Sequence, residues 1–148
     1  MKLEFDTVET NEFERLFDVV KQGLFTHVDK VFGWDDDFQR ERLKNNYQSS
    51  WFHWVVKDEE QVALACFKPY ENALHLHFLI VFPDRQRKGI GQQVMAQIEQ
   101  MAKGAGCEKV TLSSFVVNSG ATSLYQKLGY QVVDQDEAFL SMALNLKE

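Results

Sequence analysis

The spacing of apolar residues at the start of the chain changes from the period of a strand to the period of a helix. Residues 2–8 alternate polar and apolar side chains, which predicts a first strand. From residue 13 to residue 31 apolar side chains recur at three- and four-residue steps, the spacing of one helix face. Thr10 is expected to cap this helix, with Glu12 and Glu14 in an acidic first turn.

The middle of the chain predicts a hairpin followed by a central strand. Residues 51–67 contain two short apolar runs separated by a polar turn at residues 57–60. A second turn at residues 69–72 leads to a nearly continuous apolar strand at 73–82, whose weak alternation predicts cover on both faces. The other predicted elements are a second helix that follows capping residues 34–37 and carries Phe38, Leu43 and Tyr47, a helix at 89–103 ended by Gly104 and Gly106, a strand at 110–114, a helix at 121–128 ended by Gly129, and a closing hairpin at 130–133 and 139–144.

This order of elements predicts an α/β fold with a central, mixed but mostly antiparallel sheet flanked by helices. No linker, repeat or low-complexity segment interrupts the pattern, so residues 1–148 are expected to form a single domain. A domain of this length can bury roughly 68–70% of the surface that its unfolded chain exposes. A stable core is therefore expected without disulfides.

Charge and cysteine usage exclude several classes of protein. The net charge of -6 argues against a protein that binds the phosphate backbone of nucleic acids. Cys66 and Cys107 both lie in apolar stretches, which favours buried thiols in a reducing compartment. The amino terminus lacks a signal-peptide pattern, and no apolar run approaches the roughly 18 residues of a membrane span. We expect a soluble, cytoplasmic protein that binds neither nucleic acid nor a membrane.

The stretch VFPDRQRKGIG, residues 81–91, joins the predicted central strand to the following helix. The first N–H groups of a helix have no internal partner, and glycine allows an anion to approach them closely. Gly89 and Gly91 stand at this helix start, and Arg85, Arg87 and Lys88 add positive charge. The stretch predicts a site for a phosphate group. The alternative is an ordinary loop in which glycine serves the backbone and the basic residues serve solubility.

The residues of this turn distinguish between known phosphate-binding patterns. A Walker loop needs Gly-Lys-Ser/Thr, and the segment GIGQ at residues 89–92 offers neither the lysine nor the hydroxyl. A dinucleotide fingerprint needs a third glycine where Val94 stands. QRKGIG, residues 86–91, instead resembles the acyl-CoA diphosphate loop of the GNAT superfamily of N-acetyltransferases. NSGATSLYQKLGY, residues 118–130, resembles the Asn-x-x-Ala-x-x-Leu-Tyr segment of the same family, although its last residue is tyrosine where phenylalanine is commoner.

The resemblance implies an acetyl-CoA-dependent N-acetyltransferase in which a primary amine attacks the thioester directly in a ternary complex, without a metal. The acceptor would be an unidentified small-molecule or peptide amine. The pantetheine would lie along residues 79–81, and the amide of Val81 would donate to the thioester carbonyl oxygen. The residues implied for acyl-CoA binding are Leu79, Ile80, Val81, Gln86, Arg87, Lys88, Gly89, Ile90, Gly91, Gln92, Asn118 and Tyr125.

Tyr125 stands where the family has the tyrosine that protonates the departing thiolate, so the resemblance implies that it is the general acid. The alternative for Tyr125 is a packed core residue, and Asn118 could contact pantetheine or cap its own helix. His75 and His77 lie two residues apart in one strand and are expected on one face. Either imidazole, or a water molecule, would take the amine proton. This pair could also start a metal site, but no third ligand stands at a recognisable spacing.

The acceptor site is expected between the first two helices and the open strand ends. Trp34 and Asp35 would suit a cationic amine there, although they could equally fill the core and cap a helix. Neither cysteine has a basic neighbour, so a covalent acyl-cysteine route is not favoured. A protein that binds acyl-CoA as a sensor without turnover is the alternative function. The closing strands could also pair in a homodimer.

Overall fold

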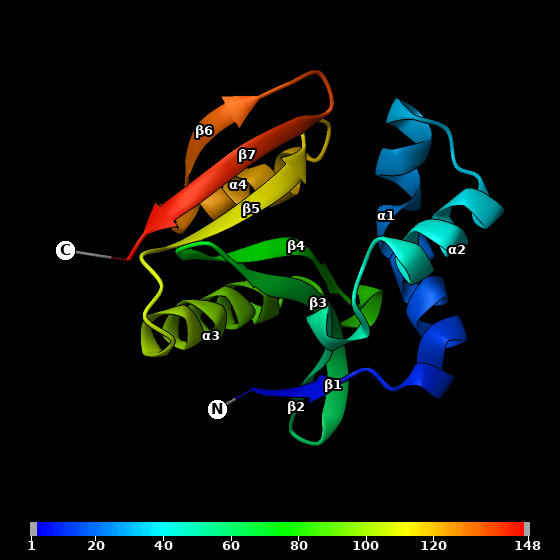
Figure 1. Cartoon of the computed structure of the whole chain (residues 1–148), viewed down its shortest axis with the longest axis horizontal. Coiled ribbons are helices and arrows are strands. Elements are labelled where there is room, and N and C mark those ends of the chain that lie inside the picture. Colours follow the sequence, from blue (N-terminus) through cyan, green and yellow to red (C-terminus); the bar gives the residue numbers. More distant parts are fainter. Residues whose placement is uncertain (1–2, 147–148) are drawn as a thin grey trace.

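The computed structural model describes residues 3–146 and contains a seven-stranded sheet with helices on both faces (Figure 1). The strand order is β1-β2-β3-β4-β5-β7-β6, so β4 lies at the centre. Within the described residues, all neighbouring strands run antiparallel except β4 and β5. The elements are β1 (Glu4–Thr7), α1 (Phe13–Val31), α2 (Asp36–Asn45), β2 (Phe52–Lys57), β3 (Glu60–Tyr70), β4 (Ala73–Val81), α3 (Ile90–Gly104), β5 (Lys109–Phe115), α4 (Ser119–Lys127), β6 (Gln131–Gln135) and β7 (Phe139–Asn145), with short 3-10 turns at Thr10–Glu12, Ser49–Trp51 and Pro83–Arg85.

The predicted order of elements and the mixed, mostly antiparallel sheet are confirmed, and the corrections concern element ends. Thr10 is not the cap: Glu9 precedes the first turn, and its N–H donates to the Glu12 carboxylate at 2.8 Å. Pro69 lies within β3 instead of in the turn, and Tyr47 lies beyond the end of α2. Residue 2 of the predicted first strand lies outside the described residues.

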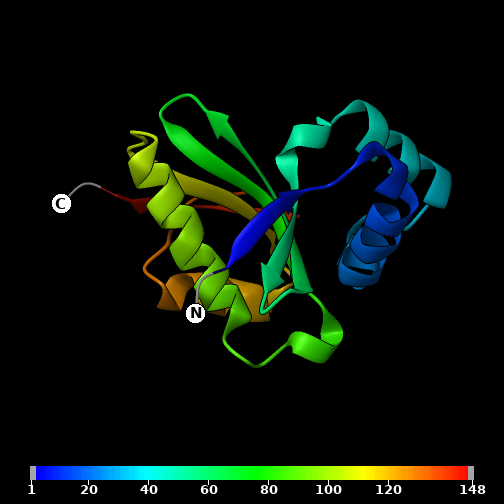
Figure 2. The same cartoon turned by 90° about the horizontal axis from the view of Figure 1, so that it is seen from below.

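Side chains of the central strands alternate between two apolar cores, one on each face of the sheet. Ala63, Ala65 and Phe67 of β3 pack with residues of α3 and α4. Leu64 and Cys66 point to the other face and pack with residues of α1 and α2. Figure 2 shows α3 on one side of the sheet and α1 and α2 on the other. The weak alternation of the central strand is thus explained by apolar cover on both faces.

The central parallel pair separates part-way along its length. β4 pairs with β5 only from Ala73 to Leu76, opposite Lys109 to Leu112. β5 continues to Phe115 in contact with β7, and β4 continues to Val81 in contact with β3. The two strands therefore diverge beyond Leu76, as Figure 1 shows, and the following residues of β4 have no strand partner on the β5 side.

A β-bulge at His77 accompanies this divergence. Cys66 of β3 lies opposite Phe78, whereas the next residue, Phe67, lies opposite Leu76, so His77 is the extra residue of β4. The bulge reverses the alternation: Leu79 and Val81 face the α3 core, and Ile80 faces the α1 core. Bulges redirect side chains in this way next to functional sites.

The α1 helix packs against β4 at a glycine, which gives a test of the packing between these two elements. A Cβ atom added to Gly23 would lie 2.6 Å from Cγ2 and 2.9 Å from Cδ1 of Ile80, which is buried. We expect Gly23→Ala to lower the free energy of unfolding by up to about 2 kcal/mol, because overpacking costs roughly 1–3 kcal/mol and better helix propensity returns about 1. Urea unfolding measures this change.

Gly104→Ala is the matched control for Gly23→Ala. Gly104 is the last residue of α3, and no atom lies within 4 Å of its added Cβ. The control should be neutral or slightly stabilising. Equal stability of the two variants would contradict the close approach of α1 to β4.

Candidate active site

A pocket of about 750 Å³ occupies the opening between β4 and β5 and extends to α1 and α2. One wall is formed by His77, Phe78 and Leu79 of β4, and the opposite wall by Ser113–Phe115 of β5. The other lining residues come from α1, α2, α4, their neighbouring segments and the start of β7: Leu24, Val28, Phe32, Gly33, Asp35, Phe38, Gln39, Arg42, Tyr47, Asn118, Ala121, Tyr125 and Phe139.

The exposed edge of β4 presents backbone N–H groups to this opening. The N–H of Phe82 donates to the carbonyl of Val62 on β3 at 3.0 Å. Successive residues of a strand turn their backbone N–H and C=O groups to opposite edges of the strand. The backbone groups of Ile80 therefore point to β3, and those of Leu79 and Val81 point to the opening. The Val81 carbonyl accepts a hydrogen bond of 3.0 Å from the side-chain amide of Gln86. The N–H groups of Leu79 and Val81 remain directed toward the opening.

The glycine turn after β4 places the start of α3 next to this edge. Arg87 and Gly89 have φ of 65° and 78°, in the left-handed region, and Gly89 is the N-cap residue of α3. The first intrahelical bond is donated by Gln93 to the Gly89 carbonyl at 3.1 Å, so the N–H groups of Ile90, Gly91 and Gln92 precede it. Such a helix start is suited to an anion.

The basic residues of the turn differ in their contacts. Arg85 donates to the carboxylate of Glu60 at 2.6 Å and lies near Asp84. Arg87 and Lys88 are exposed on the turn itself. The sequence predicted three positive charges beside the start of α3. Two of them, Arg87 and Lys88, remain there without, among the described residues, the carboxylate contacts of Arg85.

Tyr125 of α4 and Asn118, the residue before this helix, line the same pocket. Tyr125 is 6% exposed, and its burial raises the pKa of the phenol to about 12. The phenol therefore stays protonated and can only donate a proton at neutral pH. Asn118 is the N-cap of α4, and its side-chain oxygen accepts from the Ala121 N–H at 3.2 Å. Both roles predicted for Asn118 are compatible with this position, because it caps the helix and also faces the pocket.

The two histidines of β4 lie together but face different neighbours. Their ring centroids are 5.0 Å apart. His75 Nδ1 lies 2.8 Å from the Thr111 hydroxyl, and desolvation lowers the pKa of this imidazole. His77 lines the main pocket and stacks on Trp51 with ring centroids 5.2 Å apart. Desolvation and the charges around it lower the pKa of His77 to about 4, so its ring is neutral at pH 7.

One ring nitrogen of His77 distinguishes it further from His75. Nε2 of His77 is buried and has no hydrogen-bond partner among the described residues. Buried polar atoms nearly always have such a partner, so an unpaired nitrogen at the pocket wall requires an explanation. A donor group of a bound molecule would supply one.

A second cavity of about 480 Å³ adjoins the first. Its lining includes His77 and Ser113, which also line the main pocket. His75, Lys68 and Lys109 also border it, together with Thr111. His75 thus belongs to the second cavity alone, whereas His77 borders both.

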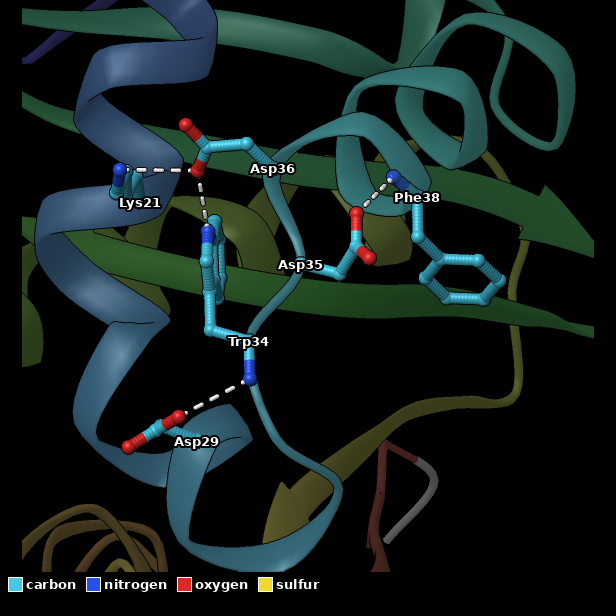
Figure 3. A network of polar contacts seen from close by, with 6 residues as sticks. All are labelled: Lys21, Asp29, Trp34, Asp35, Asp36 and Phe38. Carbon is cyan, nitrogen blue, oxygen red and sulfur yellow. Dashed lines mark hydrogen bonds and ion pairs between the residues drawn. The ribbon is translucent and has the colours of Figure 1, made fainter.

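Trp34 and Asp35, the residues predicted to contact the acceptor, organise the start of α2 (Figure 3). Asp35 accepts from the Phe38 N–H at 3.0 Å as the helix cap, and it also borders the pocket. Trp34 donates from Nε1 to Asp36 at 2.6 Å, and Asp36 in turn pairs with Lys21 of α1 at 2.9 Å. Trp34 is not among the residues that border the pocket; its ring packs near Phe17 and Phe25 of α1.

Several pocket residues escaped the sequence analysis. Phe38, Gln39 and Arg42 line the pocket from one face of α2, beside the predicted Asp35, and the four- and three-residue steps from Phe38 and Gln39 to Arg42 could have revealed that face. Phe115 and Phe139 are opposite each other on β5 and β7 with ring centroids 4.7 Å apart. No local pattern announces this pair, because it depends on the register of two strands.

The described residues also bear on a metal site, a covalent cysteine and a membrane-spanning helix. Residues 3–146 contain no group of three or more His, Cys, Asp and Glu side chains that could hold a metal ion. Cys66 is buried, and desolvation raises the pKa of its thiol, which disfavours the thiolate that a covalent route needs. In the same part of the chain, no helix has the length and apolar character needed to cross a membrane.

Comparison with known proteins decides the family. The profile of the Acetyltransferase (GNAT) family matches residues 14–130, which is most of the chain. The chain belongs to this acetyltransferase family. The resemblance noted at residues 86–91 and 118–130 is thereby confirmed, and so is the fold class.

Solved structures share the fold of this GNAT protein at low sequence identity. PaiA N-acetyltransferase from Thermoplasma acidophilum, in complex with coenzyme A, matches with a TM-score of 0.75 and 19% identity, over 98% of this chain and 99% of that one. The ribosomal-protein-S18-alanine N-acetyltransferase from Escherichia coli matches with a TM-score of 0.69 and 18% identity, over 99% and 95%.

Sequence relatives of this GNAT protein match over shorter stretches. N-acetyltransferase 8 of Homo sapiens is 30% identical over 89 residues, which are 55% of this chain and 39% of that protein. The thialysine N-epsilon-acetyltransferase of Mus musculus is 29% identical over 68 residues, which are 46% of this chain and 40% of that protein. The match thus covers about two fifths of each relative.

Proposed function

We propose that this GNAT protein transfers an acetyl group from acetyl-CoA to a primary amine by direct attack in a ternary complex. The observation that carries the proposal is the opening between β4 and β5: Leu79 and Tyr125 border the pocket there, the N–H groups of Leu79 and Val81 point toward the opening, and the turn after β4 leads to the start of α3. The coenzyme A in the PaiA structure supports acetyl-CoA as the donor.

The backbone around the opening fits the parts of an acyl-CoA in order. The N–H groups at the start of α3, between Gly89 and Gln92, would bind the diphosphate, with Arg87 and Lys88 adding positive charge. The pantetheine would lie along Leu79 to Val81 as an added strand. The N–H of Val81 would then donate to the thioester carbonyl oxygen as its charge develops in the transition state.

The reaction moves two protons in balance. The neutral amine nitrogen forms a bond to the thioester carbon, the carbon–sulfur bond breaks, and the sulfur takes the proton of the Tyr125 phenol. The nitrogen loses one proton, and His77 is the favoured acceptor because its neutral ring borders the pocket and its Nε2 lacks a partner among the described residues. A water molecule or His75 would be the alternative route.

Binding selectivity gives the first test of the proposal. At a concentration of about 100 times Kd, acetyl-CoA should stabilise the folded chain by roughly 2.7 kcal/mol, which corresponds to a rise in Tm of about 5–10 °C. CoA should act similarly, and ATP and NAD at the same concentrations should shift Tm by less than about 1 °C. Release of free thiol from acetyl-CoA in the presence of a panel of primary amines then measures the activity.

Two results would contradict the proposal in different ways. A Tm shift with ATP or NAD as large as with CoA would make the turn a general phosphate site. A shift with acetyl-CoA but no thiol release with any amine would favour a non-catalytic acyl-CoA sensor.

The cytoplasmic location and the homodimer stay predictions from the sequence.

The titration of the two proposed proton carriers predicts the pH dependence. His77 is neutral above its pKa of about 4, and Tyr125 is protonated below its pKa of about 12. Both groups are in their active forms between these limits, so kcat should be constant from about pH 6 to about pH 10. Over the same range kcat/KM should rise with pH until the acceptor amine itself is neutral. Initial rates across this range, with saturating acetyl-CoA, check the prediction.

Acceptors with different amine pKa values provide the control for this profile. The rise in kcat/KM should move with the pKa of the amine, because it belongs to the substrate. An additional inflection of kcat near the ordinary imidazole pKa of about 6.5 would show that a histidine with an unshifted pKa carries the proton.

A further inference from the structure

We infer that the acceptor is an α-amino acid with an apolar side chain, whose carboxylate is bound by Arg42; this inference rests on the acetyl transfer proposed for the same pocket. Three features of the pocket carry it. They are a cation that has no carboxylate partner among the described residues, the nearness of that cation to His77, and a group of exposed aromatic side chains along the outer wall.

Arg42 is available for an anion. Among the described residues that border the main pocket, the charged side chains are Asp35 and Arg42. Arg42 forms no ion pair with a described carboxylate, whereas Arg40 on the same helix donates to Glu14 at 2.6 Å. Asp35 does not neutralise Arg42, because seven residues of helix separate them by roughly 10 Å and its carboxylate caps the helix at Phe38.

The position of Arg42 places the anionic group of the acceptor near the reacting amine. Its guanidinium carbon lies 5.6 Å from the centre of the Tyr47 ring, and that ring lies 5.2 Å from the His77 ring. The charge of Arg42 is also one of those that lower the pKa of His77, behind desolvation, His75 and Lys68. The Tyr47 ring thus lies beside both Arg42 and His77, so an amine at His77 and an anion at Arg42 can come from one small molecule. An α-amino acid carries both groups on one carbon.

The aromatic wall accounts for the rest of the acceptor. Phe32 and Phe38 border the pocket and are each 63% exposed, which is unusual for such large apolar side chains. Phe32 lies 6.2 Å from Phe139, and Phe139 lies 4.7 Å from Phe115, measured between ring centroids. An apolar side chain bound here would remove aromatic surface from water, whereas a polyamine would bring further positive charge toward Arg42.

Three related amines separate the contribution of the carboxylate from that of the ring. L-phenylalanine, L-phenylalaninamide and phenethylamine share the aromatic group and the amine, but only the first has a carboxylate. We expect the KM of the full-length chain for L-phenylalanine to be at least about tenfold lower than for the amide, since a charge-assisted bidentate contact is lost. The amide has the lower amine pKa, so at a given pH a larger fraction of it carries the neutral amine that reacts. A lower KM for L-phenylalanine therefore cannot be explained by the fraction of neutral amine.

Neutralising Arg42 should remove that preference selectively. Arg42→Met should raise KM for L-phenylalanine about tenfold or more and change KM for phenethylamine less than about twofold. Lys44→Met is the matched control: Lys44 lies on α2, outside the pocket lining, with its ammonium 5.1 Å from the centre of the Phe13 ring. The control should leave both KM values unchanged.

Failure of this inference can be told from failure of the proposed function. Equal KM for L-phenylalanine and its amide, or an equal effect of Arg42→Met on all three amines, would overturn the role of Arg42 while acetyl transfer stands. If no amine releases thiol, the proposed transfer fails, and calorimetric titration of L-phenylalanine into the CoA-bound chain decides the inference separately. Binding that Arg42→Met weakens about tenfold would support it, and absence of binding would overturn it.

Discussion

Tyr125→Phe is expected to lower kcat by about a hundredfold or more while the affinity for acetyl-CoA changes less than about threefold. The variant keeps the ring of this pocket residue in its buried place in α4 and removes only its hydroxyl. Burial raises the pKa of this phenol to about 12, so the phenol is protonated at neutral pH and can act as an acid but not as a base. Steady-state thiol release and calorimetric titration with acetyl-CoA measure the two quantities.

Tyr130→Phe is the matched control for this variant. The two tyrosine rings lie 5.9 Å apart, but the Tyr130 hydroxyl donates to the Glu99 carboxylate of α3 at 3.0 Å. Its removal should cost about 1 kcal/mol of folding free energy and leave kcat within about twofold of the unmodified chain. Comparable loss of kcat in both variants would show a packing effect, and unchanged kcat in Tyr125→Phe would remove the acid assignment.

Gly91→Val should weaken acetyl-CoA binding by about a hundredfold, equivalent to about 2.7 kcal/mol. A Cβ atom on Gly91 would lie 3.3 Å from Cδ2 of Leu124 in α4 and 3.9 Å from Cγ2 of Val81 in β4. A branched side chain would therefore fill the space between the end of β4 and α4, next to the N–H groups proposed to hold the diphosphate. Each charge-assisted hydrogen bond lost there is worth roughly 1.5–3 kcal/mol.

Gly104→Val tests whether this loss is specific. It makes the same change at the other end of α3, where no atom lies within 4 Å of the added Cβ. We expect its affinity for acetyl-CoA, measured by calorimetry, to be unchanged. Equal affinities of the Gly91 and Gly104 variants would show that the start of α3 does not take part in donor binding.

Local sequence patterns predicted the elements and led to the proposed donor side of the site. Gly89 and Gly91 indicate a helix start that is suited to an anion, and Tyr125 follows the cap residue Asn118 at a fixed distance along one helix. Such features depend only on residues close in sequence, so a single chain is enough to recognise them. The order of strands and helices could be predicted for the same reason.

The acceptor side could not be predicted in the same way because it depends on contacts between distant elements. The bulge at His77 results from the register of β4 against β3, and it decides that Ile80 faces α1 while Leu79 faces α3. Arg42 reaches the neighbourhood of His77 only after α2 packs against the sheet. Residues 34–37 were predicted to cap a helix, with Trp34 and Asp35 as alternative contacts for a cationic amine, and Asp35 and Asp36 are engaged in capping and in an ion pair.

The short contact between β4 and β5 gives acetyl-CoA a structural role under the proposed function. Only four residue pairs join the two halves of the described sheet along this seam, and beyond them the halves are separated by the pocket. A pantetheine chain bound to Leu79 and Val81 would occupy the place of the missing strand contacts. Under the proposed function, the molecule that the enzyme consumes would also hold the sheet closed, and each release of product would leave the fold less rigid until the next donor binds.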